Sequence, residues 1–451
     1  MTRRTQIAIA GAAAVLLVVM AGLAFFLLSP SPPPYVLATA TGGPPQILTR
    51  PIPDSVPNAA QLRRGQYLVR VGDCTSCHTR EGGVPFAGGF GLNTPFGVIY
   101  STNITSDRHH GVGALTPEKF YRVLHDGVGP KGALLYPAMP YPYFARVTRA
   151  DSDAMLAYLK TVPASPNRRP PDDLPFPFSI RSLVGAWNLL FFDSGVFEPD
   201  PAKSAQWNRG AYLVTGLGHC GACHTPKNAL AGDRNSQALQ GGYLDTWIAP
   251  DLTSNTRTGV GSWSRQDIVD YLKTGRSVRA NAAGPMAEVV ANSTSLLSDA
   301  DLAAIAEYLK DQPASPDRVS SEAPDAAVLR RGAAIFSDAC SACHMASGTG
   351  QSRLFPSLHG NAMLQQSDPS GLLHLILAGG RTAPTPSRPT PVSMPSFASK
   401  LGDRQIADVA TYIRNSMGNR AEPVTAKQAA AMRRRLGLQS VRLTDNSGDW
   451  P

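Results

Sequence analysis

Six cysteines stand at a spacing that suits covalent attachment of a prosthetic group. They form three copies of one pattern: Cys74-Thr75-Ser76-Cys77-His78, Cys220-Gly221-Ala222-Cys223-His224 and Cys340-Ser341-Ala342-Cys343-His344. In this pattern each thiol can form a thioether with a haem vinyl group, and the adjacent histidine can bind the iron. No cysteine lies outside the three motifs. The sequence therefore predicts three covalently bound c-type haems.

Other uses of a paired cysteine are possible in principle. A single Cys-x-x-Cys can be a redox dithiol, half of a zinc site or a disulfide. A zinc site would need further thiol or imidazole ligands at finger-like spacing, and the chain offers no such second pair. Three copies with no cysteine left over favour haem over these alternatives.

Each haem iron needs a second axial ligand, and methionine is the usual one in electron-transfer cytochromes, where it raises the reduction potential. Three methionines stand beside a proline at corresponding places after the motifs, namely Met139, Met286 and Met394. We expect the axial pairs to be His78 with Met139, His224 with Met286, and His344 with Met394. Met286 should lie in a loop before the last helix of its unit.

Several other residues compete for this role. Met155 falls on a predicted helix, where a methionine more often packs in the core. Met363 and Met417 are rivals of Met394 in less suitable sequence contexts. The remaining histidines do not recur at equivalent positions, so we expect surface or supporting roles for them: His109, His110, His125, His219, His359 and His374.

The elements that must position these residues repeat along the chain, which indicates an array of related units. Each unit opens with a short predicted helix, at 64–69, 209–214 and 331–336. Each closes with an amphipathic helix, at 153–160, 299–310 and 403–414. Hydroxyl caps at Thr116 and Ser264 predict helix starts in the first two units. The third unit lacks this insert and is shorter. The fold class is therefore mainly α, with three tandem cytochrome c-like helical domains after a single N-terminal transmembrane helix.

Length and composition support several small domains. Only 43% of the 451 residues are hydrophobic and 39 are proline, so a haem in each domain would supply apolar contact that the sequence lacks. The net charge of +9 is scattered rather than gathered in a basic block, which argues against nucleic acid as a partner. Around Arg433–Arg435 a basic helix is either a docking element or a solvated face.

The N-terminal region has the pattern of a membrane anchor. Residues 7–28 are uncharged and apolar and follow Arg3 and Arg4, which predicts a transmembrane helix with the rest of the chain exported. A cleaved signal peptide is the competing interpretation. The expected divisions are 1–6 cytoplasmic N-terminus, 7–28 anchor, 29–58 proline-rich spacer, 59–163 first cytochrome c domain, 164–205 linker, 206–313 second domain, 314–325 linker, 326–418 third domain and 419–451 tail.

Over about residues 60–420 the chain resembles a known family, the cytochrome c subunits of periplasmic membrane-bound dehydrogenases in acetic acid bacteria and their relatives. The motifs that carry the resemblance are 209–214 running into 218–226, 100–105, 136–141 and 406–414. The resemblance implies electron transfer from a catalytic subunit, through three haems with the axial ligands named above, to ubiquinone or the respiratory chain. It also implies a place on the cytoplasmic membrane with the haem domains in the periplasm, and no catalytic site in this chain.

The resemblance also bears on the partner. The stretch 283–290 is similar to subunits that serve molybdenum hydroxylases, which favours a molybdopterin aldehyde dehydrogenase with a 2Fe-2S subunit. A quinoprotein alcohol dehydrogenase or a flavoprotein sugar-acid dehydrogenase is the alternative. Two other functions remain open at this point: a self-contained haem peroxidase or reductase, and a tethered electron shuttle without a stable partner.

Overall fold

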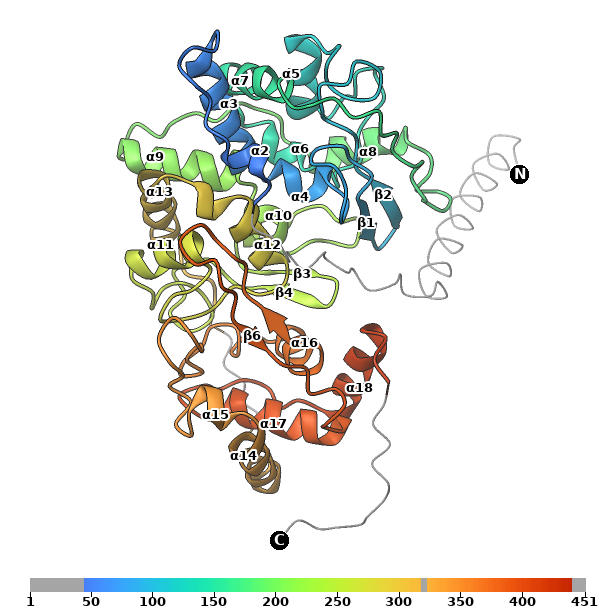
Figure 1. The fold of residues 1–451 in the computed structure, drawn as a ribbon. Coiled ribbons are helices and arrows are strands. Elements are labelled where there is room, and N and C mark those ends of the chain that lie inside the picture. Colours follow the sequence, from blue (N-terminus) through green and yellow to red (C-terminus); the bar gives the residue numbers. More distant parts are fainter. Residues whose placement is uncertain (1–43, 318–322, 440–451) are drawn as a thin grey trace, which may run out of the picture.

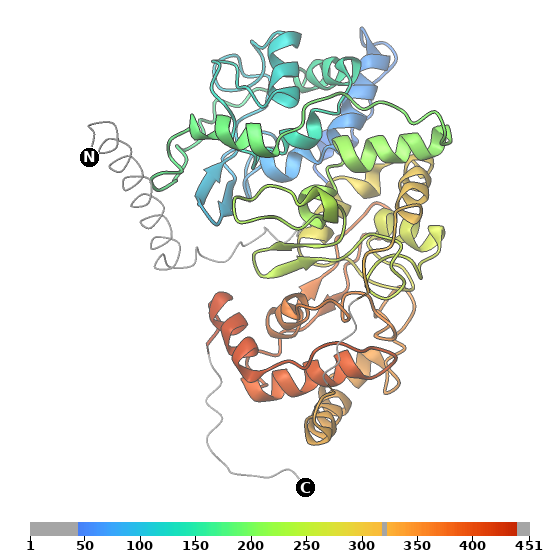
Figure 2. The same ribbon diagram turned by 180° about the vertical axis from the view of Figure 1, so that it is seen from behind.

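The computed structural model describes residues 44–317 and 323–439, and it is mainly helical, as predicted. We call 59–163, 206–313 and 326–418 the first, second and third units. Along the chain they lie at the top, middle and bottom of Figure 1. The opposite view in Figure 2 shows the same order, so the second unit lies between the other two.

The units share a common set of elements. Before and within the first unit are α2 (Gln46–Thr49), α3 (Ala59–Val71), α4 (Cys74–His78), β1 (Gly91–Thr94), β2 (Gly97–Tyr100), α5 (Pro117–His125), α6 (Tyr141–Phe144) and α7 (Arg149–Leu159). The second contains α9 (Ala205–Tyr212), α10 (Gly221–His224), β3 (Gly242–Leu244), β4 (Trp247–Ala249), α11 (Arg265–Thr274), α12 (Pro285–Asn292) and α13 (Asp299–Lys310). The third contains α14 (Ala326–Ala339), α15 (Ser341–His344), α16 (Ser370–Ala378), β5 (Gly380–Arg381), β6 (Ser393–Met394) and α17 (Asp403–Asn415).

The helix starts follow the signals in the sequence. Thr116 accepts a hydrogen bond from the backbone of Lys119, and proline occupies the first position of α5. Ser264 and Asp267 form a reciprocal capping box at the start of α11. The three closing helices α7, α13 and α17 all form where the amphipathic pattern predicts them. Each strand pair is a two-stranded antiparallel hairpin.

In every unit the opening helix crosses the closing helix at a glycine. A Cβ at Gly65 would lie 1.9 Å from the Ala154 carbonyl oxygen, so only glycine admits this approach of the two backbones. The same contact recurs at Gly210 and Gly332. An arginine precedes each glycine and forms an ion pair with an aspartate of the closing helix: Arg64 with Asp151, Arg209 with Asp301 and Arg331 with Asp408.

The first two units share one apolar core, which the sequence did not predict. Its buried members come from both units and include Leu68, Leu159, Leu213 and Leu302. Tyrosines cross the boundary in both directions: Tyr67 donates to Asp301 Oδ2 at 2.5 Å, and Tyr212 donates to Asp151 Oδ2 at 2.6 Å. The third unit has its own core around α16, α17 and Phe336.

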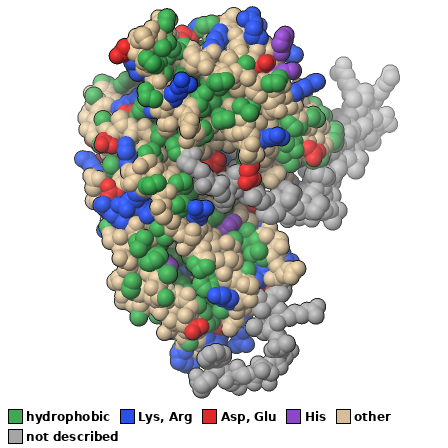
Figure 3. Space-filling model, viewed as in Figure 1, with side chains coloured by type: hydrophobic (Ala, Val, Ile, Leu, Met, Phe, Trp, Pro, Cys, Tyr) green, Lys and Arg blue, Asp and Glu red, His purple; other side chains and the backbone are tan. Residues whose placement is uncertain are grey.

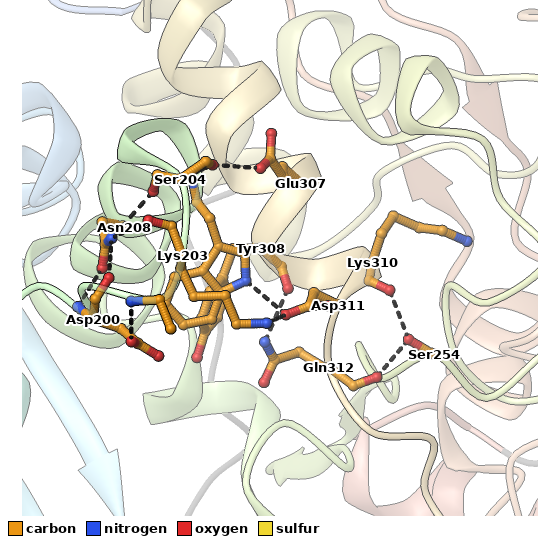
Figure 4. Close-up of polar contacts among 12 residues, drawn as sticks. Asp200, Lys203, Ser204, Asn208, Ser254, Glu307, Tyr308, Lys310, Asp311 and Gln312 are labelled. Carbon is orange, nitrogen blue, oxygen red and sulfur yellow. Dashed lines mark hydrogen bonds and ion pairs between the residues drawn. The ribbon is translucent and has the colours of Figure 1, made fainter.

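Polar contacts fasten α9 to α13 at their outer ends (Figure 4). Lys203 donates to Asp311 at 2.6 Å, and Ser204, the cap of α9, donates to Glu307 at 2.8 Å. Ser254 donates to the Lys310 carbonyl at 3.0 Å from the neighbouring loop. These contacts hold the crossing that places the second haem motif.

The long linker between the first two units is part of the fold rather than a free tether. It contains α8 (Leu183–Phe191). Tyr141 of the first unit donates to Asn188 of α8 at 2.5 Å, and Trp187 of α8 donates to the Leu230 carbonyl of the second unit at 2.8 Å. The outer face of α8 exposes Leu189, which is 87% accessible.

The three arginines at the end of the C-terminal basic helix α18 (Ala426–Arg435) differ: Arg434 and Arg435 are exposed, whereas Arg433 is buried. Arg433 is 1% exposed, because its guanidinium donates to Asp403 and to two backbone carbonyls of the third unit. Arg435 reaches the second unit and donates to Asp245. Elsewhere, Figure 3 shows lysine and arginine side chains spread among acidic and hydrophobic ones on the face in view.

The predicted membrane anchor, 7–28, lies outside the described residues. Within 44–317 and 323–439, every helix is too short or too polar to span a bilayer.

Candidate haem sites

Each Cys-x-x-Cys-His motif folds as a single helical turn. The first motif is α4, and the second and third motifs place Cys220 and Cys340 at the caps of α10 and α15. Residues three apart on a helix lie on one side of it, so both thiols of a motif can face the same group. No two of these six cysteines form a disulfide, so all of them are available for thioether bonds.

The three motif histidines are oriented alike. His78 Nδ1 lies 2.6 Å from the Thr102 carbonyl oxygen, and His224 Nδ1 lies 2.7 Å from that of Pro250. His344 Nδ1 lies 3.1 Å from the carbonyl oxygen of Pro356. Because a carbonyl only accepts, Nδ1 carries the proton and Nε2 keeps its lone pair for a metal, which is the arrangement of ligating histidines. The residues present therefore fit a haem iron.

Burial shifts the pKa values of the three motif histidines and of the cysteines of the second motif in the direction that favours their neutral forms. It lowers the pKa of His78, His224 and His344, which keeps each imidazole neutral, as an iron ligand must be. Burial raises the pKa of the Cys220 thiol to about 12 and that of Cys223 to about 11. Reactive redox thiols have lowered pKa values, so these are unsuited to a thiolate dithiol centre.

The three predicted methionines lie on different kinds of element. Met139 precedes α6 and packs against the shared core, and Met394 lies on β6 against the third core. Met286 is in the first turn of α12 rather than in a loop, because Pro285 starts a helix there. The assignment of these sulfurs to iron stays a prediction.

The rival methionines have different surroundings. Met155 is buried in the shared core, as expected for a packing role. Met417 lies beside the third motif, and its sulfur is 2.1 Å from the position of a Cβ at Gly348. Met417 thus remains a competitor of Met394 on position alone.

One large cavity connects the first two haem motifs. It has a volume of about 1390 Å³, and both Cys77 and Cys223 line it. Tyr143 and residues of the β1–β2 hairpin, α8, α12 and α18 also line it. The second cysteine of each of these two motifs therefore lines the same cavity. The sequence alone could not indicate that the two motifs share a cavity.

Two histidines outside the motifs lie at contacts between units. His219 lines the cavity and meets Phe144 edge to face at 5.4 Å. His374 of the third unit lies 3.9 Å from the Trp247 ring of the second, and its Nδ1 is 2.9 Å from Thr246 Oγ1. Burial lowers the pKa of His374 to about 4. Neither is a mere surface residue.

Arg276 is a buried cation between the second and third units that sequence reasoning missed. It is 5% exposed and donates to Thr382 Oγ1 at 3.3 Å and to the carbonyl of Thr390. Its Nε has no hydrogen-bond partner among the described residues. Burial, with repulsion from Arg388, lowers its pKa. The segment that it binds leads into Met394.

A mainly helical chain with cysteine pairs on single turns and histidines held for ligation is a c-type cytochrome. The cytochrome c family model matches residues 208–313 and 329–416. The chain is 42% identical over 390 residues to the cytochrome c subunit of alcohol dehydrogenase (quinone) from Gluconobacter oxydans, covering 80% of each chain.

Two further relatives extend this comparison. The gluconate 2-dehydrogenase cytochrome c subunit of Pantoea cypripedii is 39% identical over 410 residues, which are 86% of this chain and 92% of that protein. A nicotinate dehydrogenase subunit of Pseudomonas putida is 40% identical over 367 residues, which are 79% of this chain and 30% of that protein. The chain belongs to the family of cytochrome c subunits of alcohol, gluconate, fructose and nicotinate dehydrogenases.

Proposed function

We propose that the chain is the electron-transfer subunit of a membrane-bound periplasmic dehydrogenase and passes electrons from a catalytic subunit, through three covalent haems, to ubiquinone or the respiratory chain. The observation that carries the proposal is the common geometry of the three motifs: in each, a backbone carbonyl fixes Nδ1 of the histidine and leaves Nε2 for iron. Bound haem supplies one-electron chemistry, and this chain needs no catalytic site of its own.

The chain's own residues hold and insulate the three sites. The cysteines would anchor each haem, and His78, His224 and His344 together with Met139, Met286 and Met394 would bind the irons. Methionine ligation favours the ferrous state and raises the potential. The position of the second unit between the other two supports an electron path in which its haem is the middle one.

For the partner, two lines of support differ. The sequence of 283–290 favours a molybdopterin aldehyde dehydrogenase with a 2Fe-2S subunit. The names of the relatives also include a quinone-linked alcohol dehydrogenase and a gluconate dehydrogenase, which support the alternative of an alcohol or sugar-acid dehydrogenase partner. Because an anchor is predicted at 7–28, we expect the chain in the membrane fraction and would purify it from there.

The deciding experiment is purification of the tagged full chain from membranes in mild detergent, followed by mass spectrometry and redox spectroscopy. We expect three low-spin haems and a co-purifying dehydrogenase subunit, whose cofactor identifies the substrate class. A chain that carries fewer than three haems would refute the three-haem proposal. A high-spin haem that turns over peroxide would instead support a self-contained enzyme. Recovery of the chain without any partner subunit would support a tethered electron shuttle.

The axial ligands can be tested in the same preparation. Replacement of Met139, Met286 or Met394 by alanine should each lower one midpoint potential and remove one methionine–iron absorption band. The matched controls are Met155→Ala, Met363→Ala and Met417→Ala. If Met417→Ala rather than Met394→Ala removed the band, the ligand of the third site would be Met417.

A further inference from the structure

The first two units exchange contacts between their methionine segments and their haem motifs. Helix α6, which follows Met139, places Phe144 against His219 at the edge of the second motif. In return α12, which carries Met286, lets Asn292 donate to Ser76 inside the first motif at 2.9 Å. Each predicted methionine segment thus lies against the cysteine turn of the other unit.

Tyr143 of α6 also lies against the second motif. A Cβ at Gly221 would lie 2.7 Å from the Tyr143 Oη and 2.9 Å from its Cε1, so the ring sits directly on the second motif. The corresponding residue of the first motif is Thr75, and that of the third is Ser341. Glycine in the second motif therefore leaves the space that the tyrosine ring fills.

The hydroxyl of Tyr143 is fixed by charged residues of the second unit. It donates to Asp233 Oδ2 at 2.6 Å, and Lys227 pairs with the same carboxylate. All three side chains line the cavity that Cys77 and Cys223 share. Burial, followed by the charge of Asp233, raises the pKa of Tyr143, so the phenol keeps its proton. The ring is thus held in one place as a neutral group.

We propose that Tyr143 is a positioning residue for electron transfer between the first and second haem sites, because its ring, seated on Gly221 and tied to Asp233, holds the Met139 segment against the second motif. The inference rests on the proposed function. The step moves one electron and no proton: one iron is oxidised, the other is reduced and the phenol is unchanged. Tunnelling weakens steeply across a gap without bonded or packed atoms, so loss of the ring should slow the step.

The test uses the full chain with its haems and three variants. Tyr143→Ala removes the ring, Tyr143→Phe keeps it without the hydroxyl, and Gly221→Ala displaces it from the motif side. The matched control is Tyr121→Ala, since that ring contacts His125 and Arg149 of its own unit. The readout is the rate at which an electron injected by pulse radiolysis redistributes among the haems, with haem content and midpoint potentials measured in parallel.

We expect Tyr143→Ala and Gly221→Ala to slow redistribution several-fold with haem content and potentials unchanged. Tyr143→Phe should restore most of the rate, and the control should match the parent chain. A double variant that combines Tyr143→Ala with Gly221→Ala should be no slower than either single variant, because both substitutions remove the same contact. Parent-like rates in both Tyr143→Ala and Gly221→Ala would overturn the inference.

The variants also separate this inference from the proposed function. Failure of the proposed function would appear in the parent chain itself, as missing haems or no exchange between them. If Tyr143→Ala failed to fold, Gly221→Ala would decide, because side chains at the equivalent positions 75 and 341 are compatible with the motif. Loss of the second haem in Gly221→Ala would also overturn the proposal, since the contact would then serve attachment.

Discussion

A Cβ at Gly210 would lie 2.0 Å from the carbonyl oxygen of Ala304, so α9 and α13 touch backbone to backbone. This contact sets the distance between the helix that leads to the second motif and the helix that closes the unit. The equivalent glycine recurs in both other units. The position of each haem motif therefore depends on a glycine at the crossing of the opening and closing helices.

Gly210→Ala should destabilise the protein by about 1–3 kcal/mol, because the added methyl group overpacks a crossing that cannot separate without moving α9. Denaturant unfolding followed by far-UV circular dichroism measures the change. Gly195→Ala is the control, since a Cβ there would meet no atom within 4 Å. Equal stability of the two variants would contradict the backbone contact.

Asp301 links acid sensitivity to the contact between the first two units. Burial acts to raise its pKa, but hydrogen bonds from Arg209 and Tyr67 outweigh burial, so the pKa lies below its ordinary value. The stabilisation should be complete above the unfolded-state pKa of about 3.9 and be lost as the pH falls through the lower folded pKa.

Asp301→Asn should therefore cost roughly 1.5–3 kcal/mol at pH 7, since charged hydrogen bonds are weakened, and the cost should shrink toward pH 3. Unfolding free energies of parent and variant at several pH values give this difference. The control is Asp54→Asn, which removes the ion pair between Arg63 and an aspartate whose side chain is 94% exposed. This variant should change the free energy of unfolding little. A cost that did not vary with pH would assign the effect to packing.

Arg276→Gln should lower the midpoint potentials of the second and third haem sites and leave that of the first unchanged. A buried cation disfavours the more positive ferric state, and its effect is strong where water is excluded. A redox titration of the full chain measures all three potentials. The exposed Arg265→Gln should have no comparable effect, because solvent screens it. Unshifted potentials in a folded Arg276→Gln chain would exclude this role.

His374 should make the contact between the second and third units sensitive to mild acid. Its pKa, about 4 in the folded state, lies below the unfolded value of about 6.5. The stabilisation is thus complete above pH 6.5 and declines as the pH falls toward 4, where protonation would bury a charge beside Trp247.

His374→Phe should keep an aromatic ring beside Trp247 and remove this dependence. Limited proteolysis between pH 7 and 4.5 would report on release of the third unit, with Trp247 fluorescence as a second probe. His359→Phe is the control in the same unit, because His359 is an exposed side chain. The same acid profile in the parent and in His374→Phe would place the sensitive group elsewhere.

Local signals in the sequence predicted much of the secondary structure. Hydroxyl caps at Thr116 and Ser264 and the apolar spacing of α13 identified helices with little error, because caps and amphipathicity are properties of adjacent residues. The Cys-x-x-Cys-His motifs are also recognised from adjacent residues, but the sequence did not predict that each would form a helical turn. The closing helices differ from the prediction mainly at the start of α7.

The contacts between units could not be predicted in this way. Tyr143 and Gly221 are far apart in sequence, and a glycine within a short motif carries no sign of the ring that rests on it. Arg433 looks like a surface residue in a basic run, yet its partners are carbonyls that only the folded third unit brings together. Such residues are identified by their neighbours in space, not in the chain.

The exchange of tyrosines between the first two units has a consequence for how the chain could be assembled. Tyr67 and Tyr212 occupy equivalent positions, and each binds the other unit's aspartate. The two units therefore use the same surface on each other, as the subunits of an isologous homodimer do. Such a pair is closed, because the interface occupies this surface on both units. Ala334 stands at this place in the third unit. A third unit could therefore join only through a different face, which here is built on Trp247 and Arg276.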